Sequence, residues 1–260
     1  MTSYKLNKSI PLLLILSIAG LLSLYFLSYL PPYTRLTLGF LIQFATFFVF
    51  RREEQFDEQK FLVVLLISII ATILWDTIAI KFNIWGFPKE SVSFWVLGIP
   101  IEEYIFGLWL STTVLGIYTS LPHFKHHPLN KSKSSDIPLL IIVFLLQSIA
   151  WLLIFFSNPT SYFKWLLILG ITPSIFFIWR RGEKIDEIRL FITCVLMIVI
   201  TVVIDLIFIK AGAWYYNDSA LIGRISIVPI DDLLFAIFCS ITIIGLYTSL
   251  PSKDVLTGKW

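Results

Sequence analysis

The sequence predicts an all-α integral membrane protein, with about eight transmembrane helices arranged as two tandem parallel four-helix repeats. Of its 260 residues, 57% are apolar and only 14% are charged, whereas roughly a quarter of the residues in a soluble domain are charged. A soluble chain of this length cannot bury so much apolar surface in one core, but lipid can cover it. The other two observations behind the prediction are a succession of long apolar segments and an internal duplication.

Eight apolar segments follow one another along the chain. A spanning helix needs roughly 20 apolar residues, and backbone groups in lipid must be paired within the segment, so we expect helices. The segments are 10–30, 36–50, 61–81, 96–119, 137–156, 162–179, 190–210 and 225–247. The first follows Lys5 and Lys8, as a signal peptide would. It is longer than the apolar part of a signal peptide and no small-residue cleavage site follows, so we expect a retained helix.

The two halves of the chain repeat at one constant spacing. This spacing separates Asp76 from Asp205, Trp85 from Trp214, Pro100 from Pro229, and Tyr118 from Tyr247. IPIEEYIF at 99–106 corresponds in the same way to VPIDDLLF at 228–235. Similarity at a fixed spacing indicates a duplication, with one repeat at 1–129 and the other at 130–260. Because each repeat has an even number of helices, we expect parallel repeats related by an axis along the membrane normal.

Positive charge predicts the orientation in the membrane. The two termini and the loops after the second, fourth and sixth segments together carry fourteen Lys and Arg residues, whereas the opposite side carries six. Lys and Arg are enriched in cytoplasmic loops. We therefore expect a multi-pass protein of the cell membrane with both termini in the cytoplasm, and the PIEE and PIDD motifs at the outer ends of their helices.

Carboxyl side chains inside apolar spans are the most informative candidates for chemistry. A charge at the bilayer centre is costly, and such residues usually face the interior of a helix bundle. Each repeat has one acid near the end of its third helix and an adjacent pair at the start of its fourth. The acids are Asp76, Glu102 and Glu103 in the first repeat, and Asp205, Asp231 and Asp232 in the second.

The paired acids allow two interpretations. Pro100 and Pro229 precede them, as at many helix starts, and the helix dipole favours acids in the first turn, so their role could be structural. Alternatively, two adjacent acids point about 100° apart on a helix, and cannot both face water comfortably. Because two close carboxyl groups do not both ionise easily, one can stay protonated and act as a general acid.

Helix periodicity separates the faces on which the two glutamates lie. Glu102 shares a face with Phe106 and Trp109, and an acid beside aromatic rings is suited to forming and holding a carbocation. Glu103 shares a face with Gly107, and a small residue there favours close helix packing. Each aromatic residue taken alone is better explained as ordinary apolar filling.

Neither a cofactor nor a nucleic-acid partner is expected. The chain has no GxGxxG motif and no P-loop, so no nucleotide or flavin site is predicted. It also lacks the basic stripe that follows nucleic acid. His123, His126 and His127 lie in a polar loop rich in Lys and Ser, where solvation is a better interpretation than metal binding.

The motifs resemble those of the flavin-free lycopene cyclase domain family of bacteria, archaea and fungi. The first repeat carries LWD at 74–76, IWGF at 84–87 and PIEEYIF at 100–106, and the second carries ID at 204–205, AWYY at 213–216 and PIDDLLF at 229–235. The family usually has Glu in at least the first acid position of each pair, so Asp231 is a departure that puts the role of the second repeat, or the identity of the substrate, in doubt.

This resemblance implies a lycopene β-cyclase that closes the ends of lycopene into β-ionone rings by acid catalysis, without redox change and without a cofactor. It implies catalytic roles for the six acids named above. It implies substrate-binding roles for Trp85, Phe106, Trp109, Trp214 and Phe235. The partners would be a lipid-soluble polyene, membrane lipid and other enzymes of carotenoid biosynthesis.

Three other functions remain open on the sequence. Tandem repeats with acids inside the membrane also fit a proton-coupled transporter. A polyprenyl transferase would need a DDxxD motif to hold a metal and diphosphate, but Leu233, Leu234 and Phe235 follow the second acid pair. A non-catalytic membrane assembly partner would not need the acids to be duplicated along with the apolar pattern.

Overall fold

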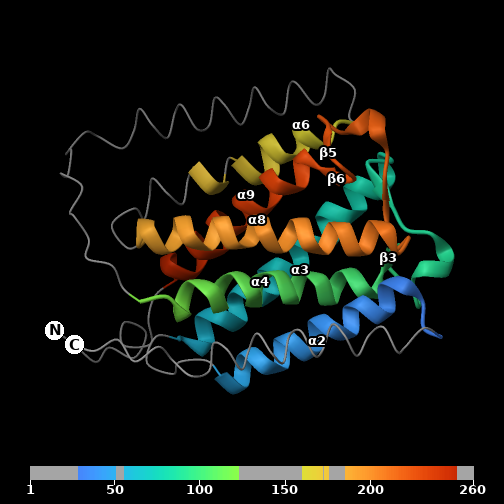
Figure 1. Ribbon diagram of the computed structural model, residues 1–260. Helices are drawn as coiled ribbons and strands as arrows, with labels where there is room; N and C mark the ends of the chain where they lie inside the picture. Colours follow the sequence, from blue (N-terminus) through green and yellow to red (C-terminus); the bar gives the residue numbers. More distant parts are fainter. Residues whose placement is uncertain (1–28, 51–55, 123–159, 172, 176–184, 251–260) are drawn as a thin grey trace, which may run out of the picture.

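The computed structural model describes residues 29–50, 56–122, 160–171, 173–175 and 185–250 (Figure 1). Within these ranges the chain is mostly helical, and the few strands are pairs of two residues in the loops at one end of the bundle. The predicted segments 10–30 and 137–156 lie outside the described residues, apart from the last two positions of the first. So do residues 172 and 176–179 of the predicted segment 162–179.

The first repeat contains three described α-helices. They are α2 (Pro32–Phe50), α3 (Glu58–Lys81) and α4 (Ile101–Ser120). Between α3 and α4 the chain forms β1 (Trp85–Gly86), the 3-10 helix η2 (Lys89–Ser91), β2 (Trp95–Val96) and β3 (Ile99–Pro100). Asp57 caps α3 because its side chain accepts hydrogen bonds from the backbone N–H groups of Gln59 and Lys60.

The second repeat follows the same order. It contains α6 (Tyr162–Leu166), a π-helical turn η3 (Leu167–Ile171), α8 (Glu187–Lys210) and α9 (Ile230–Ser249). The loop before α9 holds β4 (Tyr215–Tyr216), the 3-10 helix η4 (Asp218–Ala220), β5 (Arg224–Ile225) and β6 (Val228–Pro229). Asp186 caps α8 as Asp57, its equivalent, caps α3.

Two predicted helix starts are wrong. The segments 96–119 and 225–247 were expected to be helical throughout, but α4 begins only at Ile101 and α9 only at Ile230. The residues before them form short hairpins, β2 with β3 and β5 with β6. The apolar composition of these hairpins resembles that of a helix. Proline sets the boundary, because Pro100 and Pro229 are the N-cap residues, in extended conformation.

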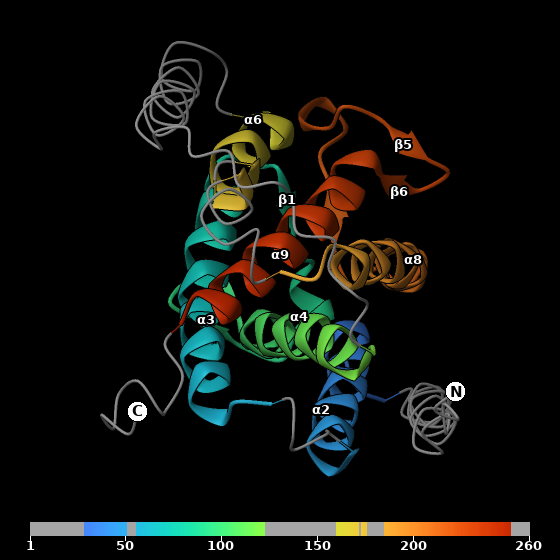
Figure 2. The same ribbon diagram turned by 90° about the vertical axis from the view of Figure 1, so that its left-hand side faces the viewer.

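Helices α4 and α9 form the centre of the bundle. Helix α4 packs against α2, α3, α8 and α9, and α9 packs against α3, α6 and α8. Viewed along the helices, α4 and α9 lie in the middle, with α3 and α8 on either side (Figure 2). The helices that begin with the acid pairs are therefore the most enclosed ones, and each contacts both halves of the chain.

The two repeats exchange contacts at both ends of the bundle. At the hairpin end, β1 pairs with β4, so that Trp85 lies opposite Tyr216 and Gly86 opposite Tyr215. At the other end, the Tyr118 hydroxyl accepts a hydrogen bond from the backbone N–H of Asp186 at 3.1 Å. The Tyr247 hydroxyl accepts the equivalent bond from Asp57 at 2.8 Å. We call this reciprocal pair of bonds the tyrosine exchange.

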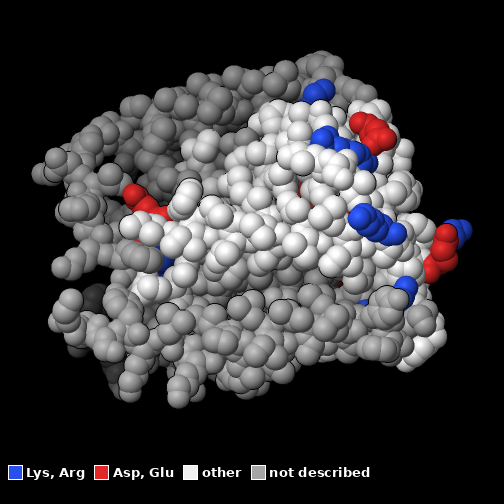
Figure 3. All heavy atoms as spheres, viewed as in Figure 1, with Lys and Arg blue, Asp and Glu red and all other residues white. Residues whose placement is uncertain are grey.

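Among the described helices, α3, α8 and α9 are long and apolar enough to cross a membrane. Large apolar side chains project outward along α3 and α8, among them Leu62, Leu66, Phe191 and Val199. Figure 3 shows a face on which charged side chains gather toward the two ends, with a broad uncharged stretch between them. This distribution is that of a multi-pass membrane protein, because lipid favours apolar side chains along the middle of a span.

The tyrosine exchange predicts unequal costs for removing its two hydroxyl groups. In Tyr118→Phe, the N–H of the buried Asp186 loses its partner, and we expect a loss of about 1–3 kcal/mol in the free energy of unfolding. Tyr247→Phe should cost less, because Asp57 is only half-buried and water can replace the hydroxyl. Thermal unfolding in detergent micelles measures both, with Tyr29→Phe at an exposed position as control. Equal losses at the two tyrosines would contradict this reasoning.

Candidate active site

Each acid pair begins a central helix directly after a hairpin. The backbone N–H of Ile101 donates to the carbonyl of Phe94 at 3.1 Å, and that of Ile230 donates to the carbonyl of Gly223 at 3.0 Å. These bonds hold the hairpins against the helix starts. The side chains of the first helical turn are therefore enclosed, and all four paired acids are at most 6% exposed.

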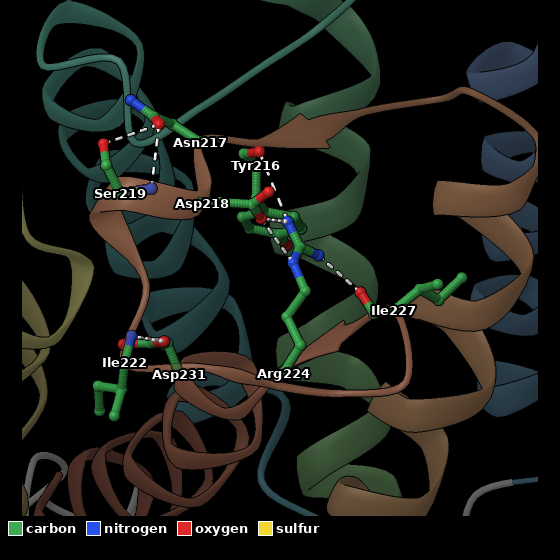
Figure 4. A network of polar contacts seen from close by, with 8 residues as sticks. All are labelled: Tyr216, Asn217, Asp218, Ser219, Ile222, Arg224, Ile227 and Asp231. Carbon is green, nitrogen blue, oxygen red and sulfur yellow. Dashed lines mark hydrogen bonds and ion pairs between the residues drawn. The ribbon is translucent and has the colours of Figure 1, made fainter.

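The first acid of each pair binds its own loop. Glu102 Oε1 accepts hydrogen bonds from the backbone N–H of Ser93 at 2.7 Å and from the Thr34 hydroxyl at 2.6 Å. Asp231 Oδ2 accepts from the backbone N–H of Ile222 at 2.9 Å, at the position equivalent to Ser93 (Figure 4). Glu102 and Asp231 thus stabilise the loops that precede their helices.

The loop of the second repeat has a further polar network (Figure 4). Arg224 donates to Asp218 Oδ1 at 2.8 Å and to the carbonyl of Ile227 at 2.7 Å. Asn217 Oδ1 accepts hydrogen bonds from the backbone and the hydroxyl of Ser219. These contacts fix the loop between β4 and α9, and so fix where α9 begins.

The second acid of each pair points inward and meets the acid of the preceding helix. Glu103 Oε1 accepts a 2.5 Å hydrogen bond from the Tyr33 hydroxyl, and Glu103 also shares a side-chain hydrogen bond with Asp76. Asp76 additionally bonds the side chain of Trp85. We call Asp76 and Glu103 the first dyad.

The second repeat builds the same arrangement, which we call the second dyad. Asp232 Oδ1 accepts from the Tyr162 hydroxyl at 2.7 Å, and Asp232 interacts with Asp205 as Glu103 does with Asp76. Tyr216, from the loop, also interacts with Asp232. Burial, and then the nearby Asp232 carboxyl, raise the pKa of the Tyr216 hydroxyl, so the phenol stays protonated as a hydrogen-bond donor.

Both dyads line one cavity of about 310 Å³. Its wall contains Asp76 and Glu103 from the first repeat and Asp205 and Asp232 from the second. Glu102 and Asp231 are not part of the wall. The structure therefore brings four of the six candidate acids together and turns the other two toward the loops.

The rest of the wall is apolar and aromatic. All five aromatic residues expected to bind substrate line the cavity, namely Trp85, Phe106, Trp109, Trp214 and Phe235. Helix periodicity predicted that Glu102 lies beside this aromatic face. Its carboxyl instead accepts hydrogen bonds from Ser93 and Thr34, and so points toward the loop. Glu103 lies both on the cavity wall and on the face of Gly107, where a Cβ would collide with Thr72 of α3.

The dyads can give and take protons. Two carboxyl groups that share a hydrogen bond hold one proton between them, because an ionised carboxylate only accepts. Asp76 Oδ2, Asp205 Oδ2 and Asp232 Oδ2 are buried and meet no N–H or hydroxyl donor, as expected where two acids face each other and share a proton. Electron-rich ring faces around them would stabilise a cation. Within the described ranges, no three His, Cys, Asp or Glu side chains are grouped as metal ligands.

Tyr33 and Tyr162 are the site residues that sequence reasoning missed. Both are almost fully buried and bond the inward acid of their own repeat. They are also separated by the spacing of the duplication, like the other equivalent pairs. The sequence therefore contained the signal, because a polar group repeated at the start of equivalent apolar segments indicates a shared polar partner.

Comparison with known proteins agrees with the duplication. The family model described as lycopene cyclase matches residues 30–121 and 159–250, two stretches of equal length that begin at equivalent positions of the two repeats. No curated protein and no solved structure matches. Both matched stretches contain the hairpin, the acid pair and the central helix that follows it.

The loop bonds of Glu102 predict a structural effect that Glu103 does not share. Glu102→Ala removes the acceptor of the Ser93 N–H and of the Thr34 hydroxyl, and should cost about 1–3 kcal/mol in the free energy of unfolding. The loop over 93–98 should then be cut faster in limited proteolysis. Glu90→Ala, in the exposed part of the same loop, is the control. Unchanged cleavage in Glu102→Ala would show that these bonds do not hold the loop.

Proposed function

The chain belongs to the lycopene cyclase family, and on this basis we propose that it is a lycopene β-cyclase that closes the ends of lycopene into β-ionone rings. Family membership implies an enzyme of carotenoid cyclisation with lycopene as substrate. The observation that carries the finer proposal is the meeting of two carboxyl dyads in one aromatic-lined cavity. A cyclisation that begins and ends with proton transfer needs a proton donor, a proton acceptor and a dry surface for the cation between them.

The proposed reaction is an isomerisation in which all atoms are retained. A carboxylic acid protonates the terminal double bond of the polyene and leaves a tertiary carbocation. The electron pair of a neighbouring double bond attacks this carbon, so a six-membered ring closes and the positive charge moves into the ring. A carboxylate then removes a ring proton, whose bonding electrons form the ring double bond. The protein gives one proton and takes one up, so the reaction consumes none.

We assign proton transfer to the inward acids and their dyad partners. Glu103 and Asp232 are held by Tyr33 and Tyr162, which fix the direction of each carboxyl group. One dyad supplies the proton and the carboxylate of the other accepts it, because both line the same cavity. In this proposal Asp76 and Asp205 are the dyad partners, whereas Glu102 and Asp231 contribute by holding the loops.

The aromatic wall would protect the cation. Trp85 and Trp214 follow α3 and α8, and Phe106, Trp109 and Phe235 project from the central helices. Ring faces attract positive charge, and a dry cavity prevents water from capturing the cation before the ring closes. The same wall suits an apolar polyene, and family membership supports this activity over the proton-coupled transporter that the acids alone would also fit.

We further propose that the chain spans the membrane about eight times, as parallel four-helix repeats at 1–129 and 130–260. The spacing of the family match and the paired contacts between equivalent residues support this organisation. Both termini would be cytoplasmic, in keeping with the bias of Lys and Arg, so the hairpins and the dyads would lie toward the outer side.

Expression of the chain in a bacterium that accumulates lycopene tests the activity. We expect pigment chromatography to show one-ringed and two-ringed β-carotenes. Glu103→Gln and Asp232→Asn should each lower the rate of cyclisation about 100-fold or more, because the amide can neither give nor take the proton. Glu102→Gln and Asp231→Asn are the matched variants, one position earlier in each pair, and should lose much less.

The comparison between neighbours decides the assignment. A larger loss in Glu102→Gln than in Glu103→Gln, at equal protein levels in the membrane, would transfer the catalytic role to the outer acid. Unchanged lycopene with the unaltered chain, confirmed in the membrane, would refute the cyclase.

Reporter fusions test the orientation. A fusion after residue 260 should be active only with a cytoplasmic reporter, and one inserted in the loop at 89–91 only with a reporter that works outside. The opposite pattern would reverse the proposed orientation, and like patterns at both sites would contradict the number of spans.

A further inference from the structure

The cavity is not symmetric, although the repeats are. Its wall includes Tyr162, Leu169 and Gly170 from α6 and η3 of the second repeat. None of the described side chains of α2, the equivalent helix of the first repeat, contributes to it. The cavity therefore extends between α3 and the α6–η3 segment, and not between α8 and α2.

Aromatic side chains fill the half that is closed. The ring of Phe40 stacks on Trp109 with centroids 4.4 Å apart and on Phe208 at 5.4 Å. Phe208 in turn packs on Trp214 at 4.5 Å. Phe40 and Phe208 are 3% and 2% exposed. They bridge α2 and α8 with stacked rings.

In the equivalent half, smaller residues stand at the positions of Phe40 and Phe208, while Trp75 of α3 packs edge-on against Tyr162 of α6. Leu169 occupies the position of Phe40, and Ala79 that of Phe208. The chain also makes a π-helical turn at Leu167–Ile171, a feature that recurs at functional sites. Gly170 lies so close to α9 that a Cβ there would come within 3.1 Å of Phe238.

A stripe of side chains on α3 forms the edge of this opening. Ile67, Ala71 and Leu74 lie on one helix face, line the cavity and are exposed on the outside of the bundle. They are at the middle of a helix long and apolar enough to cross a membrane. The cavity thus reaches the surface where lipid tails, and not water, would meet it.

Helix α8 presents the matching stripe outside the cavity, although its Thr201, Ile204 and Asp205 belong to the cavity wall. Leu196, Ile200 and Val203 are the equivalents of the α3 residues, and none of them lines the cavity. Leu196 is 41% exposed, like Ile67 at 40%. The α3 stripe therefore lines the cavity and the α8 stripe does not, although Ile67 and Leu196 are equally exposed.

We propose that the polyene enters sideways from the bilayer, between α3 and the α6–η3 segment, and that Phe40 and Phe208 keep the equivalent passage closed. This inference rests on the proposed function for the nature of the ligand. The enzyme then has one reaction chamber served by both dyads. A polyene that receives two rings leaves after the first and returns with its other end foremost.

A pair of equivalent substitutions tests the entrance. Ile67→Trp puts a large ring at the mouth, and should lower the rate of lycopene cyclisation about tenfold. Leu196→Trp puts the same ring at the equivalent lipid-facing position and should change the rate by less than about twofold. Ile67→Ala keeps the mouth open and should lower the rate less than Ile67→Trp does. Membrane levels and thermal unfolding are measured for each chain, so that a folding defect is recognised.

Two readouts separate this proposal from the activity itself. Cyclised product is measured in membranes, and the amount of lycopene that co-purifies with each chain is measured without turnover. Reduced retention in Ile67→Trp alone supports the entrance even if no ring is formed, in which case only the cyclase is refuted. If the unaltered chain is active, equal losses of cyclisation rate and of retained lycopene in Ile67→Trp and Leu196→Trp contradict the proposed entrance. A larger loss in Leu196→Trp contradicts it as well.

Discussion

The structure depends on the placement of buried carboxyl groups inside an apolar bundle. Removing a carboxyl from water is costly unless its oxygens find partners, and lipid supplies none. The partners come from three places: a tyrosine at the start of α2 or α6, the acid of the preceding helix, and the backbone of the hairpin. Because each of these elements must be in place before the acid is satisfied, the acids fix where the loops and the central helices lie.

Duplication provides this environment twice and then joins the two copies. Tyr33 packs its ring on Trp214 of the other repeat at 5.4 Å, and Tyr162 packs on Trp85 at 5.0 Å. The tyrosine that orients each carboxyl is thus itself held by the opposite half. The two halves differ in side-chain volume at some positions, as at Phe208 and its equivalent Ala79. The polar framework stayed paired, while the volume around it became unequal.

Much of this arrangement could be predicted, and the exceptions have physical reasons. Apolar composition and the constant spacing between equivalent motifs predicted the class of protein and the duplication, since both are properties of long stretches. The starts of α4 and α9 were misplaced because Trp95 and Val96 are as apolar in a hairpin as in a helix. Whether Glu102 or Glu103 faces the cavity depends on a rotation of about 100°. That rotation is set by the loop bonds of Glu102, which have no sequence signature.

The tyrosine exchange also has a consequence for the order in which the molecule is made. When the first repeat leaves the ribosome, the partners of Asp57 and Tyr118 have not yet been synthesised, since they are Tyr247 and Asp186. The first repeat must therefore wait in the membrane with this end of its helices unfinished. Arg189 joins that end before Tyr247 does, with its guanidinium 4.5 Å from the Tyr118 ring and a 2.9 Å bond to the Tyr118 carbonyl. Biogenesis thus closes the bundle from its carboxy-terminal half.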